Sequence, residues 1–170
     1  EALDAALNEI AADPSIKVVI LSGDGKAFCA GHDLNEMRGK SPEALTDLFA
    51  RCSALMLRIQ SLPQPVIAQV HGIATAAGCQ LVATCDLAVA ADDTKFGVNG
   101  VDIGLFCSTP MVALTRNIGR KAAFEMLTTG KFIDAVEAKT LGLINHAVPR
   151  DDLSDATLDL AQTIASKLSS

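Results

Sequence analysis

Residues 72–86 read GIATAAGCQLVATCD, and this stretch decides how the rest of the chain is interpreted. It follows the β-branched run VIAQV and contains two glycines and four alanines. Small residues let the backbone come very close to another group, because little side chain stands in the way. The loop leads to Gln80, a neutral amide that cannot take up a proton at neutral pH. The stretch therefore predicts close backbone approach next to a residue without acid–base chemistry.

A second loop of small residues, FCAGHD at 28–33, follows another buried-type strand, KVVILSG at 17–23. Ligands of parallel α/β proteins bind at the carboxyl ends of the strands. Two backbone N–H groups that converge there from separate loops would form an oxyanion hole, and a helix that opens in the second loop would add positive potential. The alternative is that the small residues only permit tight strand–helix packing. GDGK at 23–26 lacks the spacing of a phosphate-binding loop.

The rest of the chain alternates between strand and helix patterns. Ser41 and Pro42 begin a long amphipathic helix as a cap and a first-turn proline. Asp134 and Glu137 resemble a capping box, for a short helix that ends at Gly142. We also expect strands at 66–72, 87–91 and 143–148, and helices at 3–10, from Thr109-Pro110, at 120–130 and at 153–168. This alternation predicts a single α/β domain over residues 1–170, with largely parallel strands and crossover helices.

Composition argues against several classes of function. The net charge of −6 and the absence of Trp and Tyr disfavour nucleic-acid binding, and no apolar run is long enough to insert into a membrane. The three histidines lie far apart in sequence, which gives a metal site little support. The five cysteines are odd in number and scattered, as in a reduced protein of the cytoplasm or, in a eukaryote, of the mitochondrial matrix.

Three longer segments carry a resemblance to a known family. They are VVILSGDGKAFCAGHDL (18–34), PVIAQVHGIATAAGCQLVATCDLAVAADDTKFGVNGVDIGL (65–105) and LTTGKFIDAVEAKTLGLINHAVP (127–149). In order and spacing they are similar to the signature regions of the enoyl-CoA hydratase/isomerase, or crotonase, superfamily. ATAAGCQLVA and IGLFCSTP further resemble its enoyl-CoA hydratase domain-containing branch.

The resemblance implies a crotonase-like spiral of ββα units, assembled as a homotrimer or a hexamer, that binds an acyl-CoA thioester in fatty-acid metabolism without a cofactor. It implies that the backbone N–H groups of His32 and Ala77 hold the thioester oxygen. The backbone of Cys29 and Ala30 would then meet the adenine end of CoA. We interpret the His32 side chain as a polar loop residue. Because the chain opens at Glu1 inside a helical pattern, we expect a fragment without the family's N-terminal hairpin and C-terminal helices.

The sequence departs from the hydratase pattern at both catalytic glutamates, which are replaced by Gln80 and Gly100. The usual pair supplies one base and one acid for adding water to an enoyl-CoA, and neither replacement can do so. Two weak candidates remain. Gln80 could orient a water molecule, and Asp102 would share a face with Gly100 in an extended segment, although a structural role is the favoured interpretation of Asp102.

Other polar residues near these motifs are interpreted as structural. Asp33 is expected to fix the loop shape, and Ser108 stands where some branches of the family have a catalytic aspartate. Cys79 and Cys107 are expected to be packing residues, because no base lies near them in sequence to activate a thiol.

Three functions stay open on the sequence alone. The first is a lyase of the enoyl-CoA hydratase type. The second is other crotonase-type acyl-CoA chemistry, such as isomerisation, decarboxylation or thioester hydrolysis. The third is a non-catalytic acyl-CoA-binding or regulatory protein that keeps the oxyanion hole as a binding feature.

Overall fold

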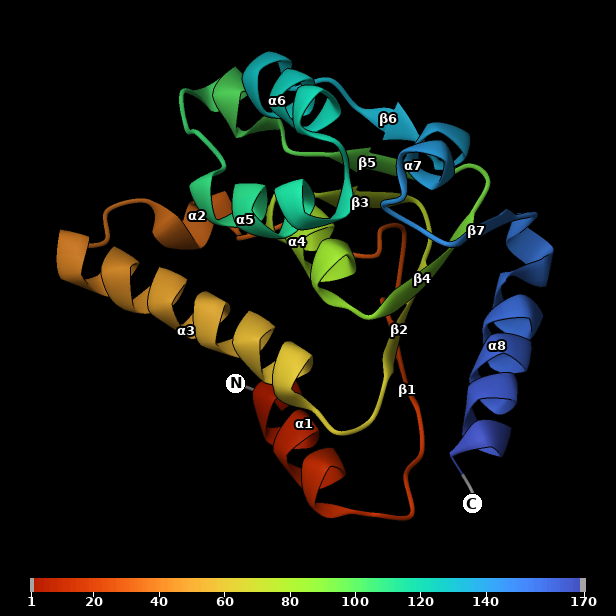
Figure 1. Cartoon of the computed structure of the whole chain (residues 1–170). Helices are drawn as coiled ribbons and strands as arrows, with labels where there is room; N and C mark the ends of the chain where they lie inside the picture. The colour runs from red at the N-terminus through yellow and green to blue at the C-terminus, as the bar shows by residue number, and fades with distance from the viewer. Residues whose placement is uncertain (1, 169–170) are drawn as a thin grey trace.

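The computed structural model describes residues 2–168, which form a mixed α/β fold around two sheets (Figure 1). The strands are β1 (Val19–Ser22), β2 (Val66–Val70), β3 (Ile73–Thr75), β4 (Leu87–Ala91), β5 (Lys95–Gly97), β6 (Ile133–Asp134) and β7 (His146–Val148). The helices are α1 (Ala2–Ala12), α2 (Leu34–Met37), α3 (Pro42–Ser61), α4 (Ala77–Thr84), α5 (Ser108–Asn117), α6 (Arg120–Thr129), α7 (Ala135–Leu141) and α8 (Leu153–Lys167), with 3₁₀ turns η1 (Asn99–Ile103) and η2 (Arg150–Asp152).

The larger sheet is fully parallel and has the strand order β1-β2-β4-β7. The smaller sheet has the order β3-β5-β6, in which β3 and β5 are parallel and β6 runs antiparallel to β5. The largely parallel arrangement confirms the prediction from the alternating strand and helix patterns.

The chain repeats a unit of two strands followed by a helix or 3₁₀ turn, and the two strands of a unit belong to different sheets. β2 and β3 lead to α4, and β4 and β5 lead to η1 and α5. The first unit repeats the pattern in reduced form. After β1, Cys29 makes an isolated parallel bridge with Ala74 of β3, and α2 follows. The repetition winds the chain into a spiral of ββα units.

Different helices cover the two faces of the larger sheet, because side chains alternate along each strand. Val66, Ala68 and Val70 of β2 face the main core, which also contains residues of α4 and α5. Ile67 instead packs with Leu153 of α8 in a smaller cluster. Figure 1 shows α8 on one side of the sheet, with α3 and α4 on the other. Burial on both faces explains why this strand reads as an almost continuous apolar run.

The N-terminal cap predicted for the long helix is present. The Ser41 hydroxyl accepts a hydrogen bond from the Ala44 backbone N–H at 3.3 Å, and Pro42 is the first helical residue. Met56 and Ile59 lie on the buried face of this helix. Because α3 packs against both α1 and α4, it forms one wall of the region in which the small-residue loops lie.

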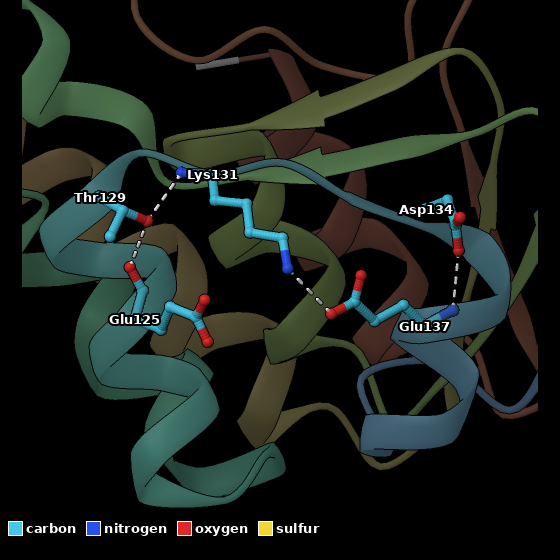
Figure 2. Close-up of polar contacts among 5 residues, drawn as sticks. All are labelled: Glu125, Thr129, Lys131, Asp134 and Glu137. Atoms are coloured by element: carbon cyan, nitrogen blue, oxygen red, sulfur yellow. Dashed lines mark hydrogen bonds and ion pairs between the residues drawn. The ribbon is translucent and has the colours of Figure 1, made fainter.

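The connection between α6 and α7 contains only half of the predicted capping box, because the Glu137 side chain pairs with Lys131 and not with the Asp134 backbone N–H (Figure 2). Asp134 Oδ1 accepts a hydrogen bond from the Glu137 backbone N–H at 2.8 Å, which confirms Asp134 as the cap. The Glu137 carboxylate pairs with Lys131 Nζ at 3.5 Å. The Lys131 backbone N–H donates to Thr129 Oγ1 at 3.2 Å, and this hydroxyl donates to the Glu125 carbonyl at 2.6 Å. The acid of the motif thus ties α7 to the end of α6.

Several elements differ from the sequence expectations. The strand expected at 143–148 is shorter, because β7 covers only His146–Val148. The three-residue strands β3 and β5 are not apparent from the sequence, because each is stabilised by a partner strand about 20 residues away. The helix α5 begins at Ser108, with Cys107 at its N-cap, and not at Thr109-Pro110. Pro110 fits inside its first turn, because the first N–H groups of a helix have no intrahelical acceptor and none is lost there.

Within residues 2–168, no helix combines the length and the apolar character needed to cross a membrane.

Candidate functional site

The two loops of small residues lie directly against each other. The Cys29 backbone N–H donates to the Ile73 carbonyl at 3.2 Å, and the Cys29 carbonyl accepts from the Thr75 N–H at 3.0 Å. The loop at 28–33 therefore behaves as a short extra strand along β3. This pairing brings the residues after Cys29 to the start of α4.

Glycine is required at the contact between the loops. A Cβ atom on Gly78 would lie 2.0 Å from the Cys29 carbonyl oxygen, and one on Gly72 would lie 2.2 Å from the Lys26 carbonyl oxygen. Gly72 also has a positive φ of 64°, which disfavours any other residue. The predicted close backbone approach is confirmed, and the group approached is the backbone of the neighbouring loop. The small residues of both loops therefore permit tight packing between them.

The residue that opens α4 has an unusual backbone conformation. Ala76 has φ 50° and ψ −119°, and it is the only residue other than glycine with positive φ among those described. Such a conformation costs an alanine about 1–3 kcal/mol. Its N–H donates to the Gly97 carbonyl at 3.0 Å, which holds it in place. Strain of this kind gathers at functional sites, and here it sets the direction of the first N–H group of α4.

Two N–H groups at this junction have no acceptor among the described residues. Ala77 is the first residue of α4, so its N–H has no intrahelical acceptor. Neither the Ala77 N–H nor the His32 N–H donates a hydrogen bond to another residue within 2–168. Gly31 links the two loops, since a Cβ there would lie 3.5 Å from the Ala77 nitrogen. The two residues that the family resemblance singled out, His32 and Ala77, therefore lie at the same junction, and their role as a donor pair stays a prediction.

Two adjoining cavities, of about 380 and 210 Å³, open beside these donors. Both are lined by His32, Phe49, Ala76, Leu105 and Cys107. Ala77 lies on the wall of the larger cavity, and Ala30 and Gly100 lie on the wall of the smaller one. Most of the wall is apolar. The cavities therefore suit an apolar group whose polar end meets the free N–H groups.

Of the two residues expected to meet the adenine end of CoA, only Ala30 lines one of these two cavities. Cys29 does not, and its backbone N–H and carbonyl both bond to β3. Phe49 and Leu105 line both cavities, and neither was predicted from the sequence as a site residue. Phe49 lies in the amphipathic pattern of α3, so it could not be told apart from the core residues around it.

The electrostatics of the cavity centre on His32. Its ring packs edge-to-face with Phe49, with 5.2 Å between the ring centroids. Burial lowers the pKa of the His32 imidazole from its ordinary value of 6.5, so the ring is neutral at pH 7. A neutral imidazole can accept a proton. His32 lines both cavities, and the Phe49 ring on which its imidazole packs lines them too; the interpretation of His32 as a polar loop residue stays a prediction.

The cysteines near the site are buried thiols. Burial raises the pKa of the Cys79 thiol to about 12. Cys107 is also buried, and both belong to the main core. A thiol with so high a pKa holds very little thiolate at neutral pH, which agrees with the packing role predicted for Cys79.

Gln80 lies one turn into α4, and the residue is only 6 % exposed. It lines a third cavity, a groove of about 190 Å³ between α3, α4 and α5. Its Oε1 atom has no hydrogen-bond partner among the described residues. Thr109 lines both this groove and the 380 Å³ cavity, so the two hollows are neighbours.

The backbone of a neighbouring turn lies where the side chain of an acidic residue at position 100 would begin. A Cβ atom at this position would lie 2.3 Å from the Leu105 carbonyl oxygen and 2.8 Å from the Cys107 sulfur. The Leu105 N–H donates back to the Gly100 carbonyl at 2.9 Å, which holds the turn at 104–107 in this place. The turn therefore occupies the start of the path that a glutamate at position 100 would take.

Asp102 does not lie on the wall of any of these three cavities. The segment is the 3₁₀ turn η1, so the expectation of an extended strand, which would give Asp102 and Gly100 a common face, is wrong. The Asp102 carboxylate accepts a long hydrogen bond from Asn99 Nδ2 at 3.5 Å and lies beside Gly130, where α6 ends. These contacts agree with the structural interpretation of Asp102.

Two other predicted residues have clear positions. Asp33 caps α2 and accepts a hydrogen bond from the Asn35 N–H at 2.8 Å, so it fixes the shape of the loop as expected. Ser108 is exposed and lines the 380 Å³ cavity at the start of α5. Within residues 2–168, no cluster of three or more His, Cys, Asp or Glu residues could hold a metal ion.

Comparison with known proteins decides the family. The family model of enoyl-CoA hydratase/isomerase matches residues 1–170. The chain belongs to the enoyl-CoA hydratase/isomerase family. Among solved structures of this family, an enoyl-CoA hydratase from Mycobacterium smegmatis has a TM-score of 0.94 and 59% identity, covering 96% of this chain and 64% of that one. This likeness confirms the crotonase-like fold.

The predicted branch of the family is confirmed as well. The chain is 49% identical over 152 residues to the mitochondrial enoyl-CoA hydratase domain-containing protein 3 of Rattus norvegicus, covering 89% of this chain and 51% of that protein. The crystal structure of the human domain-containing protein 3 has a TM-score of 0.91 and 46% identity, covering 96% of this chain and 66% of that one. The chain spans about half the length of the curated relatives it matches first.

Proposed function

We propose that this protein binds an acyl-CoA thioester whose carbonyl oxygen accepts hydrogen bonds from the His32 and Ala77 backbone N–H groups. The observation that carries the proposal is the packing of the two loops, which brings both unpaired donors to one cavity. Two such donors, fixed before the ligand arrives, stabilise the negative charge that develops on a thioester oxygen. Membership of the enoyl-CoA hydratase/isomerase family supports the choice of a CoA thioester.

The positions proposed for the acyl chain and the adenine end follow from placing the thioester oxygen at these two N–H groups. The acyl chain would enter the apolar cavities beside Phe49 and Leu105, and the adenine end would lie near Ala30. The proposed setting is fatty-acid metabolism, with no cofactor, in a trimer or paired trimers of the protein. The mitochondrial relatives support the matrix as the compartment in a eukaryote.

Hydration by the usual pair of glutamates is not supported by these residues. The Gln80 amide is neither an acid nor a base near neutral pH, Gly100 has no side chain, and Asp102 does not line these three cavities. A lyase reaction of the hydratase type would have to rely on Gln80 to orient water. A non-catalytic acyl-CoA-binding protein fits the same cavity without further requirements, and the turn packed against Gly100 favours it.

His32 supports one further candidate, an enzyme that removes the α-proton of the bound thioester. The C–H electron pair would move onto the thioester oxygen as an enolate, held by the two N–H groups, while the proton passes to the neutral imidazole. In D₂O the carbon would regain a deuteron. His32→Gln keeps the backbone N–H but removes this base, so loss of deuterium uptake with retained binding would support this candidate. Uptake that survives the substitution would exclude it.

The proposal is tested on the full-length protein with two assays side by side. Loss of the conjugated-thioester absorbance reports hydration of crotonyl-CoA, and calorimetric titration reports binding of acetoacetyl-CoA. Binding without hydration is the expected result. Hydration that falls when Gln80 or Asp102 is replaced by Ala would identify an unconventional hydratase. Absence of binding would contradict the acyl-CoA function.

A further inference from the structure

Cys107 is a buried thiol on the walls of the site proposed for the thioester. The residue is 6 % exposed, and it lines both the 380 Å³ and the 210 Å³ cavity. It occupies the N-cap position of α5, but its side chain makes no capping hydrogen bond. The side chain at this position commonly accepts a bond from the first turn of the helix. The Cys107 thiol is therefore not used to cap the helix that begins beside it.

The contact with Gly100 shows where the sulfur lies. A Cβ atom at Gly100 would lie 2.8 Å from Cys107 Sγ, which is closer than a side-chain carbon approaches a neighbouring atom. Gly100 lines the 210 Å³ cavity together with Ala76 and Asn99. The sulfur therefore stands beside the place that a side chain at position 100 would take. Glycine at this position leaves room for the thiol.

The same two cavities bring a base and two hydrogen-bond donors to Cys107. His32 lines both of them, and its ring packs edge-to-face on Phe49, which also lines both. The backbone N–H groups of His32 and Ala77 have no acceptor among the described residues. A nucleophilic thiol needs a nearby base, and its attack on a carbonyl needs donors for the oxyanion. The sequence alone offers Cys107 no base, because His32 lies on a distant loop that only the fold brings to these cavities.

Cys107 is distinguished from the other cysteines by its position. Among the described residues, no other cysteine lines either cavity. Cys79 lies near Cys107, but burial raises the pKa of the Cys79 thiol to about 12, so it stays neutral at pH 7. A neutral neighbour does not repel negative charge that develops on the Cys107 sulfur.

We propose that Cys107 takes the acyl group from the bound CoA thioester; this inference rests on the acyl-CoA function proposed above. The sulfur forms a bond to the thioester carbon while its proton passes to the His32 imidazole. The C=O electron pair moves onto the oxygen, which the two backbone N–H groups hold. When this pair returns, the bond from the carbon to the CoA sulfur breaks, and CoA leaves with the proton from His32.

The products of this step are an acyl group on Cys107 and free CoA. The new bond is again a thioester. Water that adds to its carbonyl carbon releases the carboxylic acid and restores the Cys107 thiol, so the step allows turnover.

The test incubates the full-length protein with butyryl-CoA, which has no conjugated double bond to which a thiol could add. Acid-quenched samples are analysed by intact-mass spectrometry, by peptide mapping and by chromatography of free CoA. We expect a mass gain of one butyryl group, located on Cys107, and release of at least as much CoA. In Cys107→Ala both signals should disappear, while calorimetric titration should still show binding of butyryl-CoA. In His32→Gln the rate of CoA release should fall about a hundredfold or more.

Cys52 provides the matched control. It lies on α3 and is half-buried, so it is more accessible than Cys107, but it lines neither cavity. Butyryl-CoA that acylated thiols by collision alone would modify the half-buried Cys29 and Cys52 before the buried Cys107. Cys52→Ser should keep both the acyl group on Cys107 and the release of CoA.

Each outcome bears on the inference. An acyl group found on Cys52 or on the exposed Ser108, or CoA release that persists in Cys107→Ala, would overturn it. Binding of butyryl-CoA without acyl transfer would also overturn it and would leave the acyl-CoA function intact. If Cys107→Ala does not fold, the peptide map of the wild type decides the matter by itself. Failure of butyryl-CoA to bind would contradict the acyl-CoA function.

Discussion

A Cβ atom would collide with a backbone carbonyl oxygen at both Gly78 and Gly100, at 2.0 Å from Cys29 and 2.3 Å from Leu105. At Gly78, in the proposed carbonyl half of the site (residues 29–32 and 76–78), this closeness joins two loops whose His32 and Ala77 N–H groups have no acceptor among the described residues. At Gly100, in the acid–base half (Gln80, Gly100 and the turn at 104–107), it lets a turn fill space that an acid would need. In the proposed function, the loops that would bind the carbonyl and the positions that would transfer protons therefore belong to separate parts of this chain.

The carbonyl half should be the less tolerant of change. Gly78→Ala places a methyl group 2.0 Å from the Cys29 carbonyl oxygen, and backbone on both sides limits relaxation. We expect it to lower the free energy of unfolding by about 3 kcal/mol or more and to abolish acyl-CoA binding. Urea denaturation measures the first effect. Gly119→Ala is the control, because nothing lies within 4 Å of a Cβ there and the loss should stay within about 1 kcal/mol.

Restoring the acid at Gly100 should fail for a related reason. Gly100→Glu meets the Leu105 carbonyl and the Cys107 sulfur, so we expect a loss of about 2–3 kcal/mol and no hydration of crotonyl-CoA. The double variant with Gln80→Glu should likewise lack hydration. A stable double variant that hydrates crotonyl-CoA would show that only the two carboxylates are missing, and that the turn at 104–107 yields to a side chain.

Gln80→Glu alone should make stability depend on pH. A carboxyl group at this buried position would have a raised pKa, because burial disfavours its charged form. The folded state then holds the proton more tightly than the unfolded state. Stability should match the wild type below about pH 4, fall as the pH rises, and level off above the folded-state pKa. The loss is about 1.4 kcal/mol for each pH unit by which the folded-state pKa exceeds that of the unfolded chain. Denaturation curves at pH 4 and pH 8 that differ from the wild type by equal amounts would contradict this.

The smallest effect is expected at the buried thiols. Burial raises the pKa values of Cys79 and Cys85 to about 12, so at pH 8 both remain protonated. Iodoacetamide should leave both unmodified in the folded protein, as read by mass spectrometry, and should modify both after denaturation. Rapid labelling of native Cys79 would mean that the carbonyl half opens more readily than its packing indicates.

Much of the fold could be predicted from the sequence, because the decisive signals are local. Ser41, Asp134 and Gly142 mark helix ends by their own chemistry, and the strand expected at 87–91 coincides with β4. The convergence of the two small-residue loops also followed, since parallel strands end at one edge of a sheet.

Other features depend on contacts between distant segments. The position of Gln80 is set by α3 and α5, which come from opposite sides of α4 in sequence. The contact between Gly100 and Leu105 arises from a turn whose shape is fixed by the 3₁₀ helix η1, and the sequence pattern gave no sign of that helix. For the same reason the face on which Asp102 lies could not be read from alternation.

In the proposed function, two backbone N–H groups hold a thioester carbonyl oxygen. A titration of the full-length protein with butyryl-CoA and with its thioether analogue, in which the carbonyl is replaced by CH₂, tests it most directly. With each hydrogen bond contributing about 1 kcal/mol, the thioether should bind about tenfold or more weakly. Equal affinity for the two ligands would contradict the role of the two N–H groups in binding the carbonyl oxygen.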